Sequence, residues 1–318
     1  MKTAALCPVL WNGFAIGSKG DVHSCCHIQP TDIGNIHDTD LRNMVNMEAI
    51  LRHRKASLEG RLHCFSGCNL RKYDKPRNFF PDERSDYDKM TYLHLFFGER
   101  CNISCIMCKV HENAKTNKAI LTPELLIKRV DLTPFNEIIV QGGEPLFIPE
   151  CREYLAYLAS IKKKYILLSN GVLIDDRTAQ DLAINAMRVC VSLNAASRDM
   201  HNKVNRGSDF NRVIANLHRL RDYREELHTD LVIHGRMTIT VPALPDIPAF
   251  IKKYKDFAFD RINFGYDMVT VPGYLAANPG FAEKLSVKTQ DALVGADLSK
   301  MDLLRLEQLG LVAPSKGA

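Results

Sequence analysis

The sequence predicts an α/β fold built on a parallel sheet, preceded by a small cysteine-rich segment. Three observations lead to this prediction. Apolar strand-like runs alternate with helical patterns through the middle of the chain, these runs are rich in Ile, Val, Leu and Phe, and half of the ten cysteines lie within residues 1–70. Strands covered by helices on both faces are apolar along their length, and connections between parallel strands contain helices.

Six strand-like runs and the helical patterns between them carry the fold prediction. The runs are residues 91–97, 136–140, 165–169, 188–193, 231–241 and 261–266. Thr122-Pro123-Glu124 provides an N-cap, a proline at the first helical position and an early acid, and Pro149-Glu150 begins another helix. Apolar stripes at helical spacing comprise Tyr154, Leu155, Leu158 and Ile161 in one helix and Phe210, Val213, Ile214, Leu217 and Leu220 in another.

Domain boundaries follow from these patterns and from composition. We expect a cysteine-rich domain over residues 1–72, a charged linker with two prolines over 73–89, a core over 90–270, and a helical cap over 271–318. Helices are predicted within the cap near residues 281–293 and 298–309. A chain of 318 residues is long enough for about two domains.

Composition narrows the class of protein. Hydrophobic residues make up 46% and charged residues 25%, as in a soluble globular protein. The net charge of +5 is mild and the longest run of like charge is Lys162–Lys164, so electrostatics alone implies no nucleic-acid partner. No window approaches the roughly 20 apolar residues that a bilayer-spanning helix needs, and we expect no membrane association.

The N-terminal residues make a poor secretion signal, because Pro8 and Asn12 interrupt their apolar stretch. Ten cysteines in a chain without such a signal favour metal or redox use over disulfides. The expected compartment is therefore the reducing cytoplasm.

Cys101, Cys105 and Cys108 form a C-x3-C-x2-C loop directly after the first strand-like run. Soft thiolates select iron–sulfur clusters or zinc over hard ions. Three thiolates on one loop can hold three irons of a [4Fe–4S] cluster and leave the fourth iron without a protein ligand. A closed structural site would need four ligands, so this loop indicates an open, reactive site. A zinc knuckle or three unrelated core thiols is the alternative.

A second motif, Gln141-Gly142-Gly143-Glu144-Pro145, follows the second strand-like run. Together, the two motifs resemble those of the radical S-adenosylmethionine (radical SAM) superfamily. The resemblance implies a partial (β/α)6 TIM-like barrel whose chemistry lies at the C-terminal ends of the strands. It also implies a [4Fe–4S] cluster on the three catalytic cysteines, and SAM with its amino group held by the glycine-acid motif. Reductive cleavage of SAM would give methionine and a 5′-deoxyadenosyl radical that abstracts a substrate hydrogen.

Other polar residues at predicted strand ends match family positions that bind SAM. Ser169, Asn170, Ser192 and Asn194 are expected to meet the ribose and the carboxylate of SAM. Two arginines are candidates for the SAM carboxylate because a guanidinium can bind a carboxylate with two hydrogen bonds. The two are Arg206 and Arg236, and a surface ion pair or a strand-end cap is the alternative for each.

The N-terminal cysteines resemble a twitch or SPASM module, which in this superfamily holds an auxiliary [4Fe–4S] cluster. Their spacing is C-x17-C…C-x3-C, and the resemblance implies one fully ligated cluster on Cys7, Cys25, Cys64 and Cys68. A zinc ribbon is the alternative. Cys26 is either a spare thiol or an alternative ligand to Cys25, and a small packed thiol is the preferred interpretation. The module usually follows the radical SAM core, whereas here it precedes it.

Two details of this module yield structural expectations. Residues 20–25 are similar to its small hairpin, in which a glycine turn precedes a strand that leads to a ligand. The following linker could reach roughly 60 Å if extended, which would let the module fold back across the mouth of the barrel. Cys151 and Cys190 are expected to be plain core thiols.

A fully ligated auxiliary cluster cannot bind substrate through iron, so the expected role is an electron conduit in a net oxidation. The main hypothesis is a radical SAM oxidoreductase that matures a peptide by dehydrogenation or crosslinking, with an external electron donor of the flavodoxin or ferredoxin type. A radical SAM enzyme acting on a small metabolite, such as a sugar or a nucleoside, is the second hypothesis. The third is a zinc-stabilised binding module without enzymatic activity.

Overall fold

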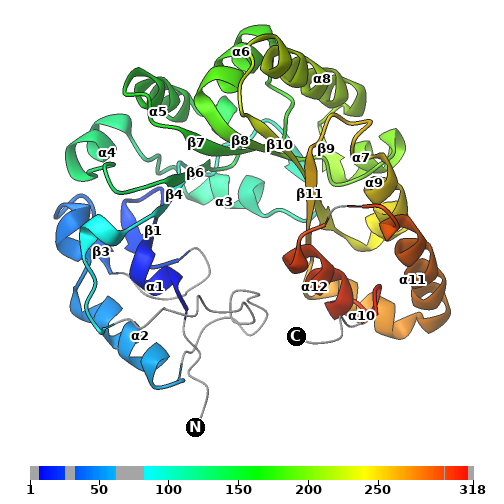
Figure 1. The fold of residues 1–318 in the computed structure, drawn as a ribbon, viewed down its shortest axis with the longest axis horizontal. Coiled ribbons are helices and arrows are strands. Elements are labelled where there is room, and N and C mark those ends of the chain that lie inside the picture. The colour runs from blue at the N-terminus through cyan, green and yellow to red at the C-terminus, as the bar shows by residue number, and fades with distance from the viewer. Residues whose placement is uncertain (1–6, 26–32, 62–81, 297, 314–318) are drawn as a thin grey trace. The chain divides into compact units, whose positions relative to one another are not determined.

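The computed structural model describes residues 7–25, 33–61, 82–296 and 298–313, and these form two compact units (Figure 1). The first unit contains the described residues up to Arg100 together with Asn113–Tyr165. The second contains Cys101–Glu112 together with the described residues from Ile166 onward. Helix α3, Val110–Thr116, crosses the division between them.

The first unit is built on a mixed sheet in the order β3-β2-β1-β4-β6. Its strands are β1 (Gly13–Ile16), β2 (Asp21–His23), β3 (Gly34–Asn35), β4 (Tyr92–Phe96) and β6 (Glu137–Gln141). Its α-helices are α1 (Val9–Asn12), α2 (Glu48–Leu58), α4 (Pro123–Arg129) and α5 (Pro149–Ser160), with 3₁₀ turns η1 (Leu41–Met44), η3 (Tyr87–Lys89) and η4 (Pro145–Phe147). The pairs β1–β4 and β4–β6 are parallel, and the pairs β1–β2 and β2–β3 are antiparallel.

The second unit contains β7 (Tyr165–Ser169), whose first residue belongs to the first unit, followed by parallel strands in the order β8-β10-β11. These strands are β8 (Ala186–Ser192), β10 (Val232–Ile239) and β11 (Arg261–Tyr266). Two short strands, β5 (Ser104–Cys105) and β9 (Asn205–Arg206), pair separately. The helices are α6 (Asp176–Asn185), α7 (Arg198–Val204), α8 (Phe210–Glu226), α9 (Ile247–Lys253), α10 (Thr270–Ala277), α11 (Pro279–Leu293) and α12 (Lys300–Gln308), with the 3₁₀ segment η5 (Val241–Asp246).

All six predicted strands are present, and the predicted α/β class is confirmed. The N-cap prediction at Thr122 is also confirmed, because its hydroxyl accepts a hydrogen bond from the Leu125 amide at 3.4 Å. The stripe prediction is wrong at Ile161. Helix α5 ends at Ser160, and the Ile161 side chain, one residue beyond it, is 45% exposed.

The N-terminal segment continues the sheet of the first unit. Strand β1 runs parallel to β4, with Gly13 opposite Tyr92 and Ile16 opposite Leu95. The predicted hairpin is confirmed: β2 returns antiparallel to β1, and Gly20 adopts φ +80° in the turn, a conformation that glycine accommodates without strain. Cys7 therefore lies before β1 and Cys25 lies after β2, both toward the edge of the sheet where β4 begins.

The described end of the predicted linker is bound to this segment by hydrogen bonds. The indole of Trp11 donates to the carbonyl of Asp82 at 2.6 Å, and the Ser85 hydroxyl donates to the carbonyl of Trp11 at 2.8 Å. Arg54, which is fully buried, donates to the carbonyl of Leu10 at 2.7 Å. These contacts hold the chain in place directly before it enters β4.

The helices of the second unit pack in pairs, and one further helix packs on the last strand. Helices α6 and α8 pack against each other, as do α9 and α11 (Figure 1). Helix α12 packs on β11, where the Asp302 carboxylate accepts a hydrogen bond from the Phe264 amide at 3.0 Å. Side-chain contacts of this kind protect an edge strand from pairing with another chain. Of the helices that the structure describes, none has the length and apolar character that crossing a membrane requires.

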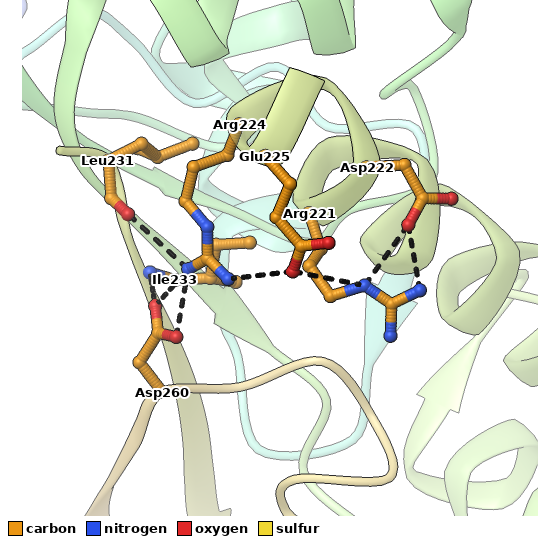
Figure 2. A network of polar contacts seen from close by, with 7 residues as sticks. All are labelled: Arg221, Asp222, Arg224, Glu225, Leu231, Ile233 and Asp260. Carbon is orange, nitrogen blue, oxygen red and sulfur yellow. Dashed lines mark hydrogen bonds and ion pairs between the residues drawn. The ribbon is translucent and has the colours of Figure 1, made fainter. Parts of the chain in front are cut away.

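An arginine–aspartate pair joins the end of α8 to the strands β10 and β11 (Figure 2). Arg224 donates to both carboxylate oxygens of Asp260, at 2.8 and 2.7 Å, and to the carbonyl of Leu231 at 3.4 Å. Asp260 also accepts a hydrogen bond from the amide of Ile233 at 2.7 Å. The Arg224 side chain is 17% exposed, so this pair is shielded from water more than an ordinary surface pair.

We predict that Arg224→Ala lowers the free energy of unfolding by about 1.5–3 kcal/mol, because two hydrogen bonds from the guanidinium to the Asp260 carboxylate are lost. The matched control is Arg221→Ala on the same helix, since Arg221 pairs with the largely exposed Asp222. The control should lose less than about 1 kcal/mol. Thermal and urea unfolding of the two variants measure the difference, and equal losses would contradict the assignment.

Candidate iron–sulfur and cofactor sites

The glycine-acid motif forms a tight turn at the carboxyl end of β6 in the first unit. The Gly143 amide donates to the Gly98 carbonyl at 2.7 Å, and the Glu144 amide donates to the Arg100 carbonyl at 2.8 Å. A Cβ atom at Gly143 would lie 2.1 Å from the Arg100 carbonyl oxygen and 2.5 Å from its carbon. Because both atoms belong to the backbone, only glycine fits this approach between the β4 and β6 segments.

Two carboxylates flank this turn. Glu144 is 1% exposed, and its side chain accepts a hydrogen bond from the Leu146 amide at 3.2 Å. Glu99 is half-buried, and its Oε2 atom has no hydrogen-bond partner within the described residues. Burial raises the pKa of Glu99, against the lowering effect of a hydrogen bond with Asn117. A carboxylate oxygen left unpaired in this way suits a cationic ligand group.

The cysteine loop belongs to the second unit, where β5 anchors it. Cys105 lies opposite Asn205 and Ser104 lies opposite Arg206 in the antiparallel β5–β9 pair. The Ile106 amide donates to the Val204 carbonyl at 2.9 Å, and the Cys108 amide donates to the Cys105 carbonyl at 3.1 Å. Cys101, Cys105 and Cys108 are all partly exposed. The sequence alone did not indicate this two-stranded anchor.

A buried polar network lies behind β9 and holds it to the ends of β8 and β10. The Asn205 side chain donates to the carbonyls of Ser192 and Leu193 at 3.1 and 3.2 Å, and accepts from the Asn194 amide group at 2.9 Å. Asn194 in turn accepts from the Thr238 amide at 2.8 Å. Asn205 is fully buried and Asn194 is 3% exposed, so the two asparagine side chains are shielded from water.

His201 extends this network toward α8. Its ring is fully buried, with Nδ1 2.7 Å from the Leu193 carbonyl and Nε2 2.9 Å from the Ser208 hydroxyl. Burial lowers the pKa of His201, which keeps the imidazole neutral, and the hydrogen bond to Leu193 acts in the opposite direction. Neither Asn205 nor His201 is among the residues predicted from the sequence.

Asn170 connects the turn after β7 to the start of the cysteine loop. Its Nδ2 atom lies 2.8 Å from Oδ1 of Asn102 and 3.9 Å from Sγ of Cys101. Its Oδ1 atom accepts from the Val172 amide at 3.0 Å, and the neighbouring Ser169 hydroxyl accepts from the Gly171 amide at 3.0 Å. Asn170 is therefore beside Cys101, and its predicted role as a SAM residue stays a prediction.

The other predicted SAM residues lie in two places in the second unit. Ser192 on β8 and Arg236 on β10 are register partners, and both are half-buried. The guanidinium of Arg236 lies over Gly265: a Cβ atom added there would be 3.4 Å from Nη2. Arg206 is exposed on β9, opposite Ser104 of the cysteine loop. Asn194 contributes its side chain to the buried network instead. The predicted roles of these residues toward SAM stay predictions.

Cys7 and Cys25 form one buried cluster with Leu10 and Trp11 in the first unit. The Cys7 amide donates to the Ser57 hydroxyl at 3.2 Å. The predicted ligands Cys64 and Cys68, and the thiol of Cys26, lie outside the described residues. The two described cysteines are at the edge where β1 and β4 begin, whereas Gly142 and Gly143 are at the edge where β4 and β6 end. A module folded across the mouth of the barrel would instead place them at the carboxyl ends of the strands.

The remaining cysteines behave as core thiols, as predicted. Cys151 is fully buried and Cys190 is 8% exposed. Burial raises the pKa of Cys151 well above its ordinary value and that of Cys190 to about 11. Such thiols stay protonated and are poor ligands and nucleophiles.

The donor chemistry fits the implied clusters and SAM. Partly exposed thiols on a loop fixed by its backbone can each bind one iron of a cluster. Within the described ranges, no three His, Cys, Asp or Glu side chains are grouped as a single metal ion would require. A [4Fe–4S] cluster does not require such convergence, because each thiolate binds a different iron. Gly143 lets the turn lie directly against the Arg100 backbone, and the unpaired Glu99 oxygen provides negative charge for an ammonium-bearing ligand.

Comparisons with known proteins identify two families whose models match parts of the chain. The radical SAM superfamily matches residues 95–239, and the SPASM iron-sulfur cluster-binding domain matches residues 7–69. The chain is 26% identical over 139 residues to a GTP 3′,8-cyclase of Clostridium botulinum, which is 41% of this chain and 43% of that protein. It is 26% identical over 133 residues to the GTP 3′,8-cyclase of Geobacter sulfurreducens, covering 40% and 41%. The chain thus spans less than half the length of these curated relatives.

A solved structure shares the fold. The structure described as native anSMEcpe with bound AdoMet and Kp18Cys peptide is 21% identical, with a TM-score of 0.50 over 68% of this chain and 66% of that one. The predicted fold class, a partial (β/α)6 barrel preceded by a SPASM-type domain, is confirmed by this likeness and by the two family matches.

We predict that Gly143→Ala weakens SAM binding by roughly 5- to 150-fold, because the added methyl group must push the Arg100 backbone away at a cost of about 1–3 kcal/mol. Gly273→Ala is the control: nothing lies within 4 Å of its Cβ position in α10, and a helical alanine is slightly stabilising. Equilibrium binding of SAM to the two reconstituted variants provides the measurement. Wild-type affinity in Gly143→Ala would refute the role of the turn.

Proposed function

We propose that this chain, which belongs to the radical SAM superfamily and carries a SPASM domain ahead of its radical SAM domain, oxidatively modifies a peptide substrate. Its cofactors are a SAM-binding [4Fe–4S] cluster, SAM and an auxiliary [4Fe–4S] cluster. In the proposal Cys7, Cys25, Cys64 and Cys68 would hold the auxiliary cluster, which would supply an acceptor for the electron that the substrate loses. The net reaction would be a dehydrogenation or a crosslink.

Each described residue has a task in this proposal. Cys101, Cys105 and Cys108 would hold the SAM-binding cluster. Gln141–Glu144 would hold the SAM amino group, while the guanidinium groups of Arg206 and Arg236 are candidates for its carboxylate. When bound, the cluster and SAM supply methionine and a 5′-deoxyadenosyl radical that takes one hydrogen atom from the substrate, so that loss of one further electron completes a two-electron oxidation.

The observation that carries the oxidative assignment is the position of Cys7 and Cys25 in the first unit. They lie at the edge of the sheet where β1 and β4 begin, and the Gly142-Gly143 turn lies at the opposite edge. Strand β4 spans five residues, which at about 3.3 Å each separates the two edges by about 16 Å. A metal centre at the far edge could accept an electron without competing for SAM. An external donor of the flavodoxin or ferredoxin type, in a reducing cytoplasm, would complete the electron supply.

A second candidate is a reaction on an anionic small molecule. The curated relatives are named GTP 3′,8-cyclases, and three basic side chains follow one register on the sheet of the second unit, of which the two arginines carry the positive charge. His234 is opposite Cys190 on β8 and Arg261 on β11, and Arg236 is two residues further along β10. Burial, followed by the charges of Arg188 and Arg261, lowers the pKa of His234 to about 4. Tight GTP binding by the purified protein, without binding of basic or neutral peptides, would favour this candidate.

We predict that Cys105→Ala abolishes 5′-deoxyadenosine formation, because a three-thiolate site has no ligand to spare. Cys151→Ala is the matched control, since this core thiol is fully buried and inert. Anaerobic reconstitution with iron and sulfide, followed by assay of 5′-deoxyadenosine, compares the two. Cleavage by Cys105→Ala at the wild-type rate would exclude the loop as the cluster site.

We predict that Cys25→Ala retains SAM cleavage but yields no oxidised product. Its iron content should fall from roughly eight to roughly four per chain, because only the auxiliary cluster is lost. Iron analysis and product assay are made on the same preparation. Full product yield with half the iron would refute the conduit role, and zinc in place of iron in the wild-type module would favour a structural role for it.

A further inference from the structure

The Asn170 side chain is held in one orientation by the turn that follows β7. It is 7% exposed, and its Oδ1 atom accepts the Val172 amide at 3.0 Å. Gly171 adopts φ +77° in the same turn, and the buried Asn216 donates to the carbonyls of Gly171 and Val172 at 2.8 and 3.2 Å. Rotating the amide by 180° would set its NH2 group against the Val172 N–H, so the oxygen and nitrogen positions are determined.

The NH2 group of Asn170 is consequently directed at the start of the cysteine loop. An amide nitrogen has two hydrogens to donate. Oδ1 of Asn102 is 2.8 Å from it, and Sγ of Cys101 is 3.9 Å from it, within reach of an N–H···S contact. A thiolate is a stronger acceptor than a thiol, because charge-assisted hydrogen bonds are shorter and stronger than neutral ones.

We propose that Asn170 is a positioning residue that donates a hydrogen bond to the Cys101 sulfur and thereby raises the reduction potential of the cluster on this loop. This inference rests on the proposed function, in which Cys101 is a cluster ligand. Hydrogen bonds to cluster sulfurs favour the reduced, more negative state and are among the factors that set the potential.

The test is a redox titration of the reconstituted full chain, monitored by the electron paramagnetic resonance (EPR) signal that responds to SAM. In Asn170→Ser the hydroxyl can still accept the Val172 amide but is too short to reach Cys101. The midpoint potential of this variant is expected to be more negative than that of the wild type. Asn216→Ala is the control, since Asn216 supports the same turn without touching the loop. It should lower the thermal midpoint and leave the potential unchanged.

The outcomes separate this inference from the proposed function. If the wild type gives no SAM-responsive signal, the proposed function fails. If the wild type gives the signal and Asn170→Ser keeps the wild-type potential, or if Asn216→Ala shifts the potential equally, the hydrogen bond has no such role.

A measurement on the wild type covers the case in which Asn170→Ser does not fold. Pulsed EPR of protein carrying nitrogen-15 in its asparagine side chains should show a nitrogen coupling to the SAM-responsive signal. Its absence would overturn the proposal.

Discussion

Hydrogen bonds from buried asparagine side chains hold the cysteine loop in place. The loop buries one apolar side chain, Ile103, among residues 101–108, so hydrophobic packing contributes little to its order. Asn205 binds the carbonyl groups at the end of β8 while its backbone pairs with Cys105, and Asn170 binds Asn102 beside Cys101. Buried amides with all partners satisfied impose one geometry, whereas a half-satisfied network would be costly. A site whose thiols must stay partly exposed needs this kind of support.

A third asparagine, Asn194, links Asn205 to the strands of the second unit. Asn194 joins the end of β8 to β10 through the Thr238 amide, and it adopts φ +61° to do so. The strands are apolar and pack under helices, so they are rigid supports. Polar groups at their carboxyl ends therefore transmit that rigidity to a loop that has no core of its own. In the first unit, the close backbone contact between Gly143 and Arg100 holds the glycine turn in place.

Strands and motifs could be predicted from the sequence because their signals are local. Each of the six strands is rich in Ile, Val, Leu or Phe over a short run, and the cysteine spacing and the glycine-acid motif are also short. The pairing of β1 with β4 could not be predicted, because its partner lies far along the chain and β1 has only four residues. Strand β9 is two residues long, too short to give an alternating sequence pattern. The structural role of Asn205 could therefore not be predicted from the sequence. The position of Asn170 directly after a strand could be predicted from the sequence. Its placement beside Cys101 could not, because it depends on tertiary structure.

The central claim is that the loop of Cys101, Cys105 and Cys108 holds a cluster with one iron open to SAM. EPR spectroscopy of the reduced, anaerobically reconstituted protein tests it most directly. The account predicts that adding SAM changes the signal of one cluster, while the signal of the auxiliary cluster stays as it was. Spectra that are identical with and without SAM would contradict it.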